Sequence, residues 1–285
     1  MTAFIEGLSA LASQYDAVLS DVWGVVHNGL ASFPEACEAL KRFRSDGGTV
    51  VLITNAPRPG KVVVRLLDKL AVPREAYDDI VSSGDVTRSV IATRPQKNIF
   101  HIGPERDLPI FDGLELRFVG LETADYVVCT GLQNDEIEGP EDYRALLMQL
   151  RARNLFMLCG NPDVVVERGE KLVYCAGAIA DLYAGLGGDV LYAGKPHEPI
   201  YAQALARINA LREAPVPLAR VLAIGDSIRT DLKGATAFGV DCLFVTAGIH
   251  AEELGARHNP SRAALDQIFK DAGTAPIAVM PRLKW

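Results

Sequence analysis

Short runs of apolar, β-branched residues alternate with segments of helical periodicity along nearly the whole chain. The apolar runs are continuous, which is typical of strands that are buried on both faces of a sheet. The predicted strands are residues 17–20, 49–54, 80–82, 98–102, 126–130, 155–159, 190–193, 220–224 and 242–246. The predicted helices include residues 34–44, 61–69, 85–91, 141–151, 199–210 and 230–237. This alternation predicts an α/β fold with a mostly parallel sheet that helices cover on both faces.

Polar residues of a distinctive kind stand at the ends of three predicted strands. Asp21 follows the first strand, and Thr54 and Asn55 end the second. Asp226 follows the strand that ends at residue 224, and Asp231 comes shortly after it. In open α/β sheets the ligand crevice lies beyond the carboxyl ends of the strands. If these three strands are neighbours, their polar residues meet in one crevice.

The chemistry of such a crevice needs positive charge. Three carboxylates at one place repel each other unless cations compensate them. Lys195, in a Gly-Lys-Pro turn after another predicted strand, offers one positive charge, and a divalent cation such as Mg²⁺ offers two more. An aspartate that attacks phosphorus needs this help because both reactants are anionic. The pattern therefore predicts an aspartate nucleophile beside a metal site, although each residue alone also fits a turn or a helix cap.

Composition narrows the class of protein. With 285 residues, 49% of them hydrophobic and 23% charged, the chain is long enough for one large or two moderate globular domains. A net charge of -7 predicts that neither nucleic acid nor an anionic membrane is a partner. The five cysteines form no C-x-x-C pair, no apolar run approaches a membrane span, and neither lysine nor arginine precedes Lys41. We therefore expect a cytoplasmic enzyme.

Four segments of the chain resemble the four motifs of the haloacid dehalogenase superfamily. They are residues 18–29 (VLSDVWGVVHNG), 51–58 (VLITNAPR), 192–197 (YAGKPH) and 221–234 (VLAIGDSIRTDLKG). Residues 80–87, 126–131 and 161–163 also resemble segments of class IIA, the subgroup of nucleotide-phosphatase-like proteins with a large α/β cap. The resemblance implies a Rossmann-like, doubly wound core formed by residues 1–82 and 188–285. An α/β cap domain would occupy residues 83–187.

The same resemblance implies a role for each matching residue. Asp21 corresponds to the nucleophile, Thr54 to the phosphate-binding hydroxyl and Lys195 to the lysine that balances phosphoryl charge. The implied magnesium ligands are Asp21, Asp226, Asp231 and the backbone carbonyl of Trp23. The implied activity is hydrolysis of a small phosphorylated metabolite through an aspartyl-phosphate at Asp21, and analogy with class IIA also suggests a homodimer. We expect Asn55, His27 and Asn161 to contact the substrate.

Trp23 departs from the family pattern. Most phosphatases of the superfamily have a second aspartate at this position, which protonates the leaving oxygen and later activates water. An indole cannot do this work, and general acid–base catalysis is typically worth about 10²–10⁴-fold in rate. Hydrolysis of an alkyl phosphate would be slowed by this full factor, and hydrolysis of an aryl or acyl phosphate would be slowed less because its leaving group is a weaker base. His27 or an acid from the cap is a candidate replacement, although a loop histidine that hydrogen-bonds the backbone is the simpler interpretation of His27.

Three other functions remain open at this point. One is a metal-dependent hydrolase of low intrinsic activity whose substrate the sequence does not identify. Another is dehalogenase-like substitution at carbon, which needs no proton donor but also has no need of the metal-binding pair Asp226 and Asp231. The third is a non-catalytic phosphometabolite-binding or regulatory protein, although Asp21 is then unexplained. Neither a P-loop nor a dinucleotide-binding fingerprint is present.

Overall fold

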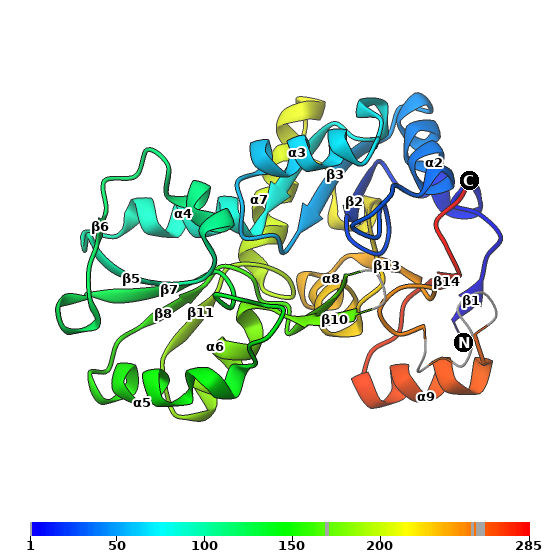
Figure 1. Cartoon of the computed structure of the whole chain (residues 1–285). Helices are drawn as coiled ribbons and strands as arrows, with labels where there is room; N and C mark the ends of the chain where they lie inside the picture. The colour runs from blue at the N-terminus through cyan, green and yellow to red at the C-terminus, as the bar shows by residue number, and fades with distance from the viewer. Residues whose placement is uncertain (1, 169–170, 252–253, 255–259) are drawn as a thin grey trace. The chain divides into compact units, whose positions relative to one another are not determined.

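Two parallel sheets organise the chain in the computed structural model, which describes residues 2–168, 171–251, 254 and 260–285 (Figure 1). The chain divides into two units by its internal contacts. We name the first the core unit; it comprises Met1–Thr54, Val64–Val81 and Pro196–Trp285. We name the second the cap unit; it comprises Asn55–Val63 and Ser82–Lys195. Each unit is described separately below.

The core unit is built on a seven-stranded sheet with the strand order β1-β14-β13-β12-β2-β3-β4. These strands are β1 (Ala3–Phe4), β2 (Ala17–Asp21), β3 (Thr49–Thr54), β4 (Asp79–Ser82), β12 (Val221–Gly225), β13 (Asp241–Val245) and β14 (Ala278–Met280). The strand β2 pairs in parallel with β12 on one side and with β3 on the other. Every residue of β2, β3 and β12 is buried, which explains why their sequences are mostly apolar.

Helices and short helical turns connect the core strands. They are α1 (Ser9–Ala12), α2 (Pro34–Ser45), α3 (Gly60–Lys69), η1 (Arg74–Ala76), α7 (Glu198–Arg212), η5 (Leu218–Arg220), the π-helix η6 (Ile228–Leu232), α8 (Lys233–Phe238) and α9 (Arg262–Ala272). The helix α2 shows why the sequence folds this way. Pro34 begins it, where a missing N–H has no cost, and Cys37, Leu40 and Phe43 form its buried face.

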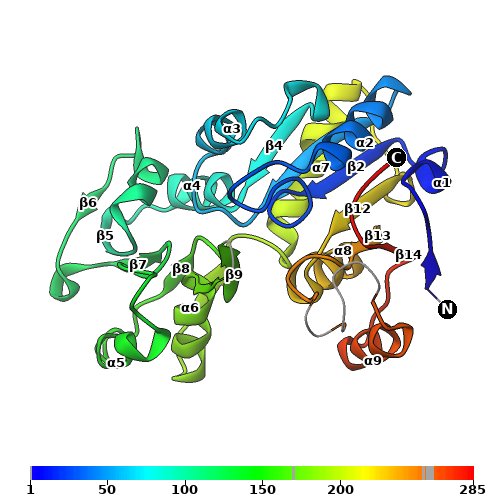
Figure 2. The same cartoon turned by 45° about the vertical axis from the view of Figure 1, so that its right-hand side comes forward.

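The cap unit has its own five-stranded sheet, with the order β11-β8-β7-β5-β6 and parallel pairing throughout. Its strands are β5 (Asn98–Ile102), β6 (Arg117–Phe118), β7 (Tyr126–Cys129), β8 (Met157–Cys159) and β11 (Val190–Tyr192), beside an antiparallel hairpin of β9 (Val165–Arg168) and β10 (Lys171–Tyr174). Its helical segments are α4 (Ser83–Thr93), η2 (Glu105–Phe111), η3 (Leu121–Thr123), η4 (Pro140–Tyr143), α5 (Arg144–Ala152) and α6 (Ala176–Gly185). Figures 1 and 2 show α5 and α6 on the face of this sheet opposite α4.

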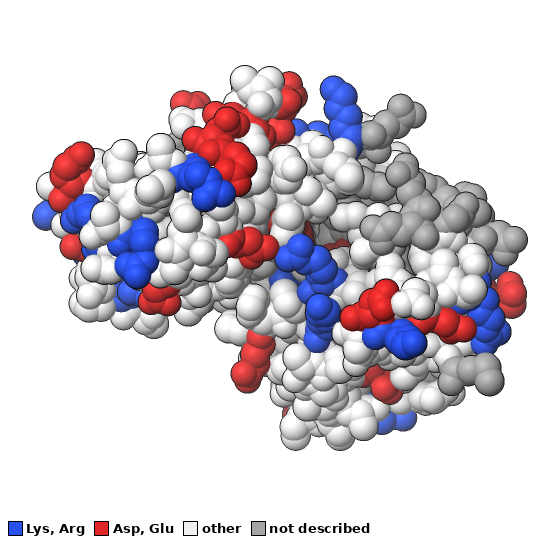
Figure 3. All heavy atoms as spheres, turned by 90° about the horizontal axis from the view of Figure 1, so that it is seen from below, with Lys and Arg blue, Asp and Glu red and all other residues white. Residues whose placement is uncertain are grey.

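The α/β fold class with parallel sheets is confirmed, but the division into units differs from the expectation in two places. Residues 55–63, expected in the core, belong to the cap unit by their contacts. We expected residues 188–195 in the core, whereas β11 pairs with β8 in the cap sheet. The predicted helix 230–237 is also not continuous, because it begins as the π-helix η6. Among the described residues, no helix is long and apolar enough to cross a membrane. On the face shown in Figure 3, acidic and basic side chains are mixed.

Candidate active site

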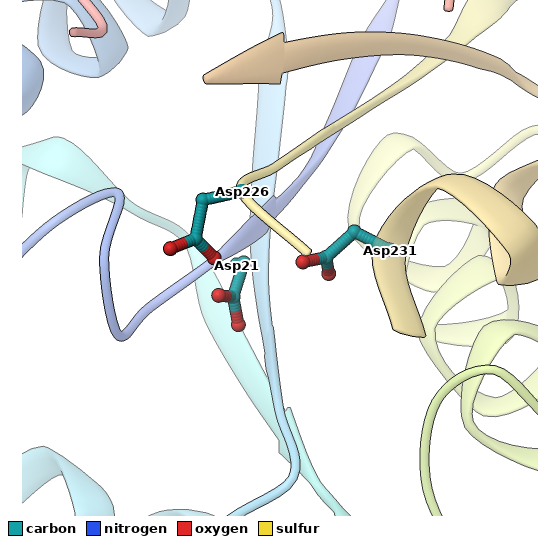
Figure 4. Close-up of side chains that lie close together, drawn as sticks. All are labelled: Asp21, Asp226 and Asp231. Atoms are coloured by element: carbon teal, nitrogen blue, oxygen red, sulfur yellow. The ribbon is translucent and has the colours of Figure 1, made fainter. Parts of the chain in front are cut away.

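Three aspartate side chains converge beyond the carboxyl ends of β2 and β12 (Figure 4). Asp21 is the last residue of β2, Asp226 follows β12 directly, and Asp231 belongs to η6. One carboxylate oxygen of each lies within 4.8 Å of the other two. The exposed fractions of the three residues are 7%, 6% and 2%. The structure thus brings together the carboxylates that the sequence placed at strand ends, because β2 and β12 are neighbours.

Two glycines allow the backbone to approach Asp226 closely. A β-carbon at Gly24 or at Gly248 would overlap the Asp226 carboxylate. Gly24 also has a φ of +87°, a conformation that residues with a side chain rarely adopt. The backbone N–H of Ile249 donates a hydrogen bond of 2.9 Å to Asp226 Oδ2. The loops after β2 and β13 therefore fix the position of this carboxylate.

The π-helix η6 brings Asp231 back toward the end of β12. The backbone N–H of Ser227 donates to Asp231 Oδ2 at 3.1 Å. From α7, the buried Tyr201 hydroxyl lies 3.4 Å from the carbonyl oxygen of Thr230 and 3.3 Å from that of Asp231. Single π turns recur at functional sites because they redirect a side chain within a helix. Here the π-helix places the third carboxylate, that of Asp231, next to the end of β12.

The donor set of this cluster fits a hard divalent cation. At an effective dielectric constant of about 20, two unit charges 4.8 Å apart repel by about 3.5 kcal/mol. Oxygen ligands from a few carboxylates are what Mg²⁺ and Ca²⁺ bind. The hydroxyl of Thr246, just beyond β13, is buried and has no hydrogen-bond partner among the described residues. We conclude that the cluster offers both the negative charge and the oxygen donors that such a cation needs.

Thr54 lies at the same edge of the core sheet. It is the last residue of β3, and Ile53 is the register partner of Asp21, so Thr54 lies one position beyond that pair. The Thr54 side chain is buried, with an exposed fraction of 7%. The neighbouring strands β12, β2 and β3 therefore deliver Asp226, Asp21 and Thr54 to one edge, and the assigned role of Thr54 in phosphate binding stays a prediction.

Trp23 and His27 pack against each other in the loop after β2. Their rings meet edge to face with centroids 5.1 Å apart, and the His27 Nδ1 accepts a hydrogen bond of 2.9 Å from the Gly29 N–H. Burial lowers the pKa of His27 to about 4, so the ring is neutral at pH 7 with its proton on Nε2. These contacts favour the interpretation of His27 as a loop brace. Its contact with substrate, and the Trp23 carbonyl as a metal ligand, stay predictions.

In the cap unit, the structure brings Asn55 to Lys195. Lys195 is 2% exposed, and its backbone N–H donates to Asn55 Oδ1 at 2.7 Å. The Asn55 Nδ2 also donates to Asp163 Oδ1 at 2.9 Å. Asn161 lies in the same turn, where its Oδ1 accepts from the Asp163 N–H at 3.1 Å. Two residues assigned to substrate contact, Asn55 and Asn161, thus bind other parts of the protein.

Sequence reasoning overlooked several residues that shape the site. Gly248 and Ile249, which contact Asp226, follow β13, and the carboxyl end of that strand carries no charged residue. The buried Thr246 hydroxyl lies at the same strand end. The available signal was the Thr-Ala-Gly sequence after a buried strand, since a hydroxyl and a glycine at a strand end favour a ligand approach. Tyr201 gave no signal, because a tyrosine on a helix is most often simply part of the core.

Comparison with known proteins gives matches over both parts of the core. A family model described as haloacid dehalogenase-like hydrolase matches residues 18–117, and a second, described as HAD-hydrolase-like, matches residues 192–272. The crystal structure of a haloacid dehalogenase-like hydrolase from Brucella suis 1330 is 48% identical. It covers 98% of this chain and 100% of that chain, with a TM-score of 0.88.

Two further relatives have more specific names. The 5'-nucleotidase YutF of Bacillus subtilis is 24% identical over 241 residues, which are 84% of this chain and 90% of that protein. A glycerol phosphate phosphatase from Mycobacterium tuberculosis, solved in complex with magnesium, is 25% identical with a TM-score of 0.65. That match covers 86% of this chain and 72% of the other. Since both family models and a relative of full length agree, the chain belongs to the haloacid dehalogenase-like hydrolase family, in the cap-bearing class IIA that its motifs indicated.

Proposed function

We propose that this protein is a magnesium-dependent phosphatase that hydrolyses a small phosphorylated metabolite through an aspartyl-phosphate at Asp21. The observation that carries the proposal is the cluster of Asp21, Asp226 and Asp231, whose carboxylate oxygens lie within 4.8 Å of one another. An aspartate that substitutes at carbon has no need of a cation, so a metal-type cluster favours phosphorus. The names of the two more distant relatives, a 5'-nucleotidase and a glycerol phosphate phosphatase, support the substrate class.

The proposed reaction has two steps that share Asp21. An Asp21 oxygen forms a bond to phosphorus while the bond between phosphorus and the leaving oxygen breaks. Water then attacks the phosphorus of the aspartyl-phosphate, which releases phosphate and a proton and restores the carboxylate. When bound by Asp21, Asp226, Asp231 and the Trp23 carbonyl, Mg²⁺ neutralises charge that would otherwise oppose the attack. The Thr54 hydroxyl and Lys195 ammonium would hold phosphoryl oxygens.

Trp23 sets the expected preference among leaving groups. Its ring packs on His27, and His27 is neutral at pH 7 because burial lowers its pKa to about 4. Neither residue is therefore suited to protonate a basic leaving oxygen. A phenolate or a carboxylate leaves without that proton, whereas an alkoxide does not. We infer that aryl and acyl phosphates are hydrolysed faster than alkyl phosphates.

The test is hydrolysis of 4-nitrophenyl phosphate beside glycerol phosphate and a 5'-nucleotide, with Mg²⁺ and with a chelator. We expect magnesium-dependent aryl turnover that Asp21→Asn lowers by at least about 10³-fold, since an amide is no nucleophile. Asp112→Asn, at an exposed position, is the matched control and should keep full activity. Undiminished activity in Asp21→Asn would exclude the covalent route. Alkyl turnover as fast as aryl turnover would mean that another residue supplies the proton.

A further inference from the structure

We propose that Asn55 is a positioning residue for the reaction: its side chain holds the backbone of Lys195 and does not contact the substrate. This inference rests on the proposed function, in which Lys195 balances the charge of the phosphoryl group. The four residues that carry the argument are Asn55, Asp163, Gly194 and Lys195. All of them belong to the cap unit, so the geometry is internal to one part of the chain.

Asn55 forms a two-point pair with the peptide groups of Lys195. Its Oδ1 accepts a hydrogen bond of 2.7 Å from the Lys195 N–H, and its Nδ2 donates one of 3.0 Å to the Lys195 carbonyl oxygen. Lys195 lies beyond the last ladder pair of β11, which is Tyr192 with Cys159. Buried backbone groups need partners, and here a side-chain amide takes the place of a neighbouring strand. The start of the lysine side chain is thereby fixed.

A third hydrogen bond anchors the amide itself. The Asn55 Nδ2 donates to Asp163 Oδ1 at 2.9 Å. Asp163 is held in turn, because its backbone N–H donates to Asn161 Oδ1 at 3.1 Å and its carbonyl accepts from the Gly177 N–H at 3.0 Å. A chain of hydrogen bonds through Asn55 and Asp163 therefore connects the Lys195 backbone to the turn between β8 and the hairpin.

These bonds use the hydrogen-bonding capacity that a substrate would need. An asparagine amide has two N–H donors, and in Asn55 one is directed at the Lys195 carbonyl and the other at Asp163. Its oxygen already accepts from the Lys195 N–H, and Asn55 is 3% exposed. A phosphoryl oxygen is a hydrogen-bond acceptor, so it could bind the Asn55 side chain only by displacing one of the two N–H bonds inside the protein. This is why we assign Asn55 to positioning and not to substrate contact.

The glycine before Lys195 supports the same interpretation. A β-carbon at Gly194 would overlap Asn55 Oδ1 and would lie 2.9 Å from both the Pro162 ring and the Ser83 hydroxyl. Gly194 does not have a positive φ, so backbone conformation does not require a glycine there. The missing side chain instead leaves room for the Asn55 amide. The nearest atom that such a β-carbon would meet is Asn55 Oδ1, so a glycine at this position gives the two-point pair the space it needs.

The first test is amide hydrogen exchange, which needs no catalytic activity. In Asn55→Ala the Lys195 amide should exchange about 10- to 100-fold faster, as expected for one lost buried hydrogen bond. Asp112→Asn, at an exposed position of the cap unit outside this hydrogen-bond network, is the control, with exchange at Lys195 within about threefold of the unmodified protein. Gly194→Ala presses on the same amide and should reproduce the faster exchange, which guards against misfolding of Asn55→Ala. Unchanged exchange at Lys195 in both variants would overturn the proposal.

The second test is a double-mutant cycle with 4-nitrophenyl phosphate as substrate. Asn55→Ala should lower kcat by at least about tenfold in the unmodified protein but by less than about twofold in the Lys195→Ala background. Equal effects in the two backgrounds would show that Asn55 acts independently of Lys195, as a substrate contact would, and would overturn the proposal. Turnover that survives Asp21→Asn would refute the proposed function alone. The exchange result would still decide whether Asn55 positions Lys195.

Discussion

Replacing Asp226 with asparagine changes the charge of the carboxylate cluster and almost nothing of its shape. The new amide oxygen can still accept the hydrogen bond that Ile249 N–H donates to Asp226 Oδ2 at 2.9 Å. Gly24 and Gly248 still leave space for the side chain. The substitution therefore isolates the electrostatic contribution of one carboxylate. We expect it to make the metal-free protein more stable and its response to Mg²⁺ weaker.

The size of the effect follows from the geometry. Asp226 faces two carboxylates within 4.8 Å, and each pair repels by about 3.5 kcal/mol at an effective dielectric constant of about 20. Relaxation of the side chains and loss of a charge-assisted hydrogen bond reduce the net gain to about 1–3 kcal/mol. For a domain of this size, that gain raises the melting temperature of the metal-free protein by roughly 3–10 °C.

The magnesium response should move in the opposite direction. At a concentration of 100 times Kd, a bound ion stabilises the folded protein by about 2.7 kcal/mol. Loss of one charged ligand should weaken binding at least about tenfold, which lowers this contribution to about 1.4 kcal/mol or less. The assay is thermal unfolding by circular dichroism, with a chelator and along a series of MgCl₂ concentrations.

Asp112→Asn serves as the control, because it removes one negative charge at an exposed position of the cap unit. It should leave both the metal-free melting temperature and the magnesium response unchanged. A metal-free Asp226→Asn protein that is less stable by more than about 1 kcal/mol, with an undiminished magnesium response, would refute the reasoning. It would mean that the three carboxylates are not a cation site.

Three further predictions concern the residues around the cluster. Trp23→Asp should accelerate hydrolysis of glycerol phosphate more than that of 4-nitrophenyl phosphate, and an equal change for both substrates would show that the missing acid does not limit the rate. Gly248→Ala should weaken magnesium binding at least about tenfold by calorimetry, because its methyl group displaces the Asp226 carboxylate; unchanged affinity would contradict the close approach. Burial lowers the pKa of His27 from 6.5 to about 4, so its contribution to stability is complete above pH 6.5 and is lost as the pH falls toward 4. The free energy of unfolding in urea should therefore fall by about 3 kcal/mol more over this range than it does in His27→Asn, and parallel pH profiles would contradict this.

Local sequence patterns were sufficient to predict the main strands and the residues of the carboxylate cluster. The strands β2, β3 and β12 are mostly apolar, β2 and β3 end in Asp21 and Thr54, and Asp226 follows β12 directly. Both the element and its chemical residue are therefore visible in a few positions of the sequence. The pairing of strands within each sheet could not be predicted from local sequence patterns. The strand β11 has the same kind of apolar sequence as a core strand, and only its register with β8 assigns it to the cap sheet. Sheet membership depends on contacts far apart in the chain.

The sequence predicted neither the helix α6 nor the role of Asn55, and the reasons are related. The sequence of α6 is apolar on most sides because the helix is largely buried, so it lacks the polar face that marks an amphipathic helix. Asn55 stands beside Thr54 in a motif, which suggested a shared role in substrate binding. Its partners, Asp163 and Lys195, are more than a hundred positions away, and no local pattern indicates them.

The placement of β2 between β3 and β12 has a consequence for biosynthesis. β3 follows β2 closely in the chain, but β12 begins at Val221, about 200 residues after Ala17, and at 5–20 residues per second its synthesis follows after roughly 10–40 s. The segment Ser82–Lys195 is made entirely within this interval. During it, one edge of an entirely buried strand is unpaired, and Asp21 has neither Asp226 nor Asp231 beside it. A nascent chain of this protein is therefore expected to depend on protection of that edge, by the ribosome or a chaperone, until the last quarter of the chain is synthesised.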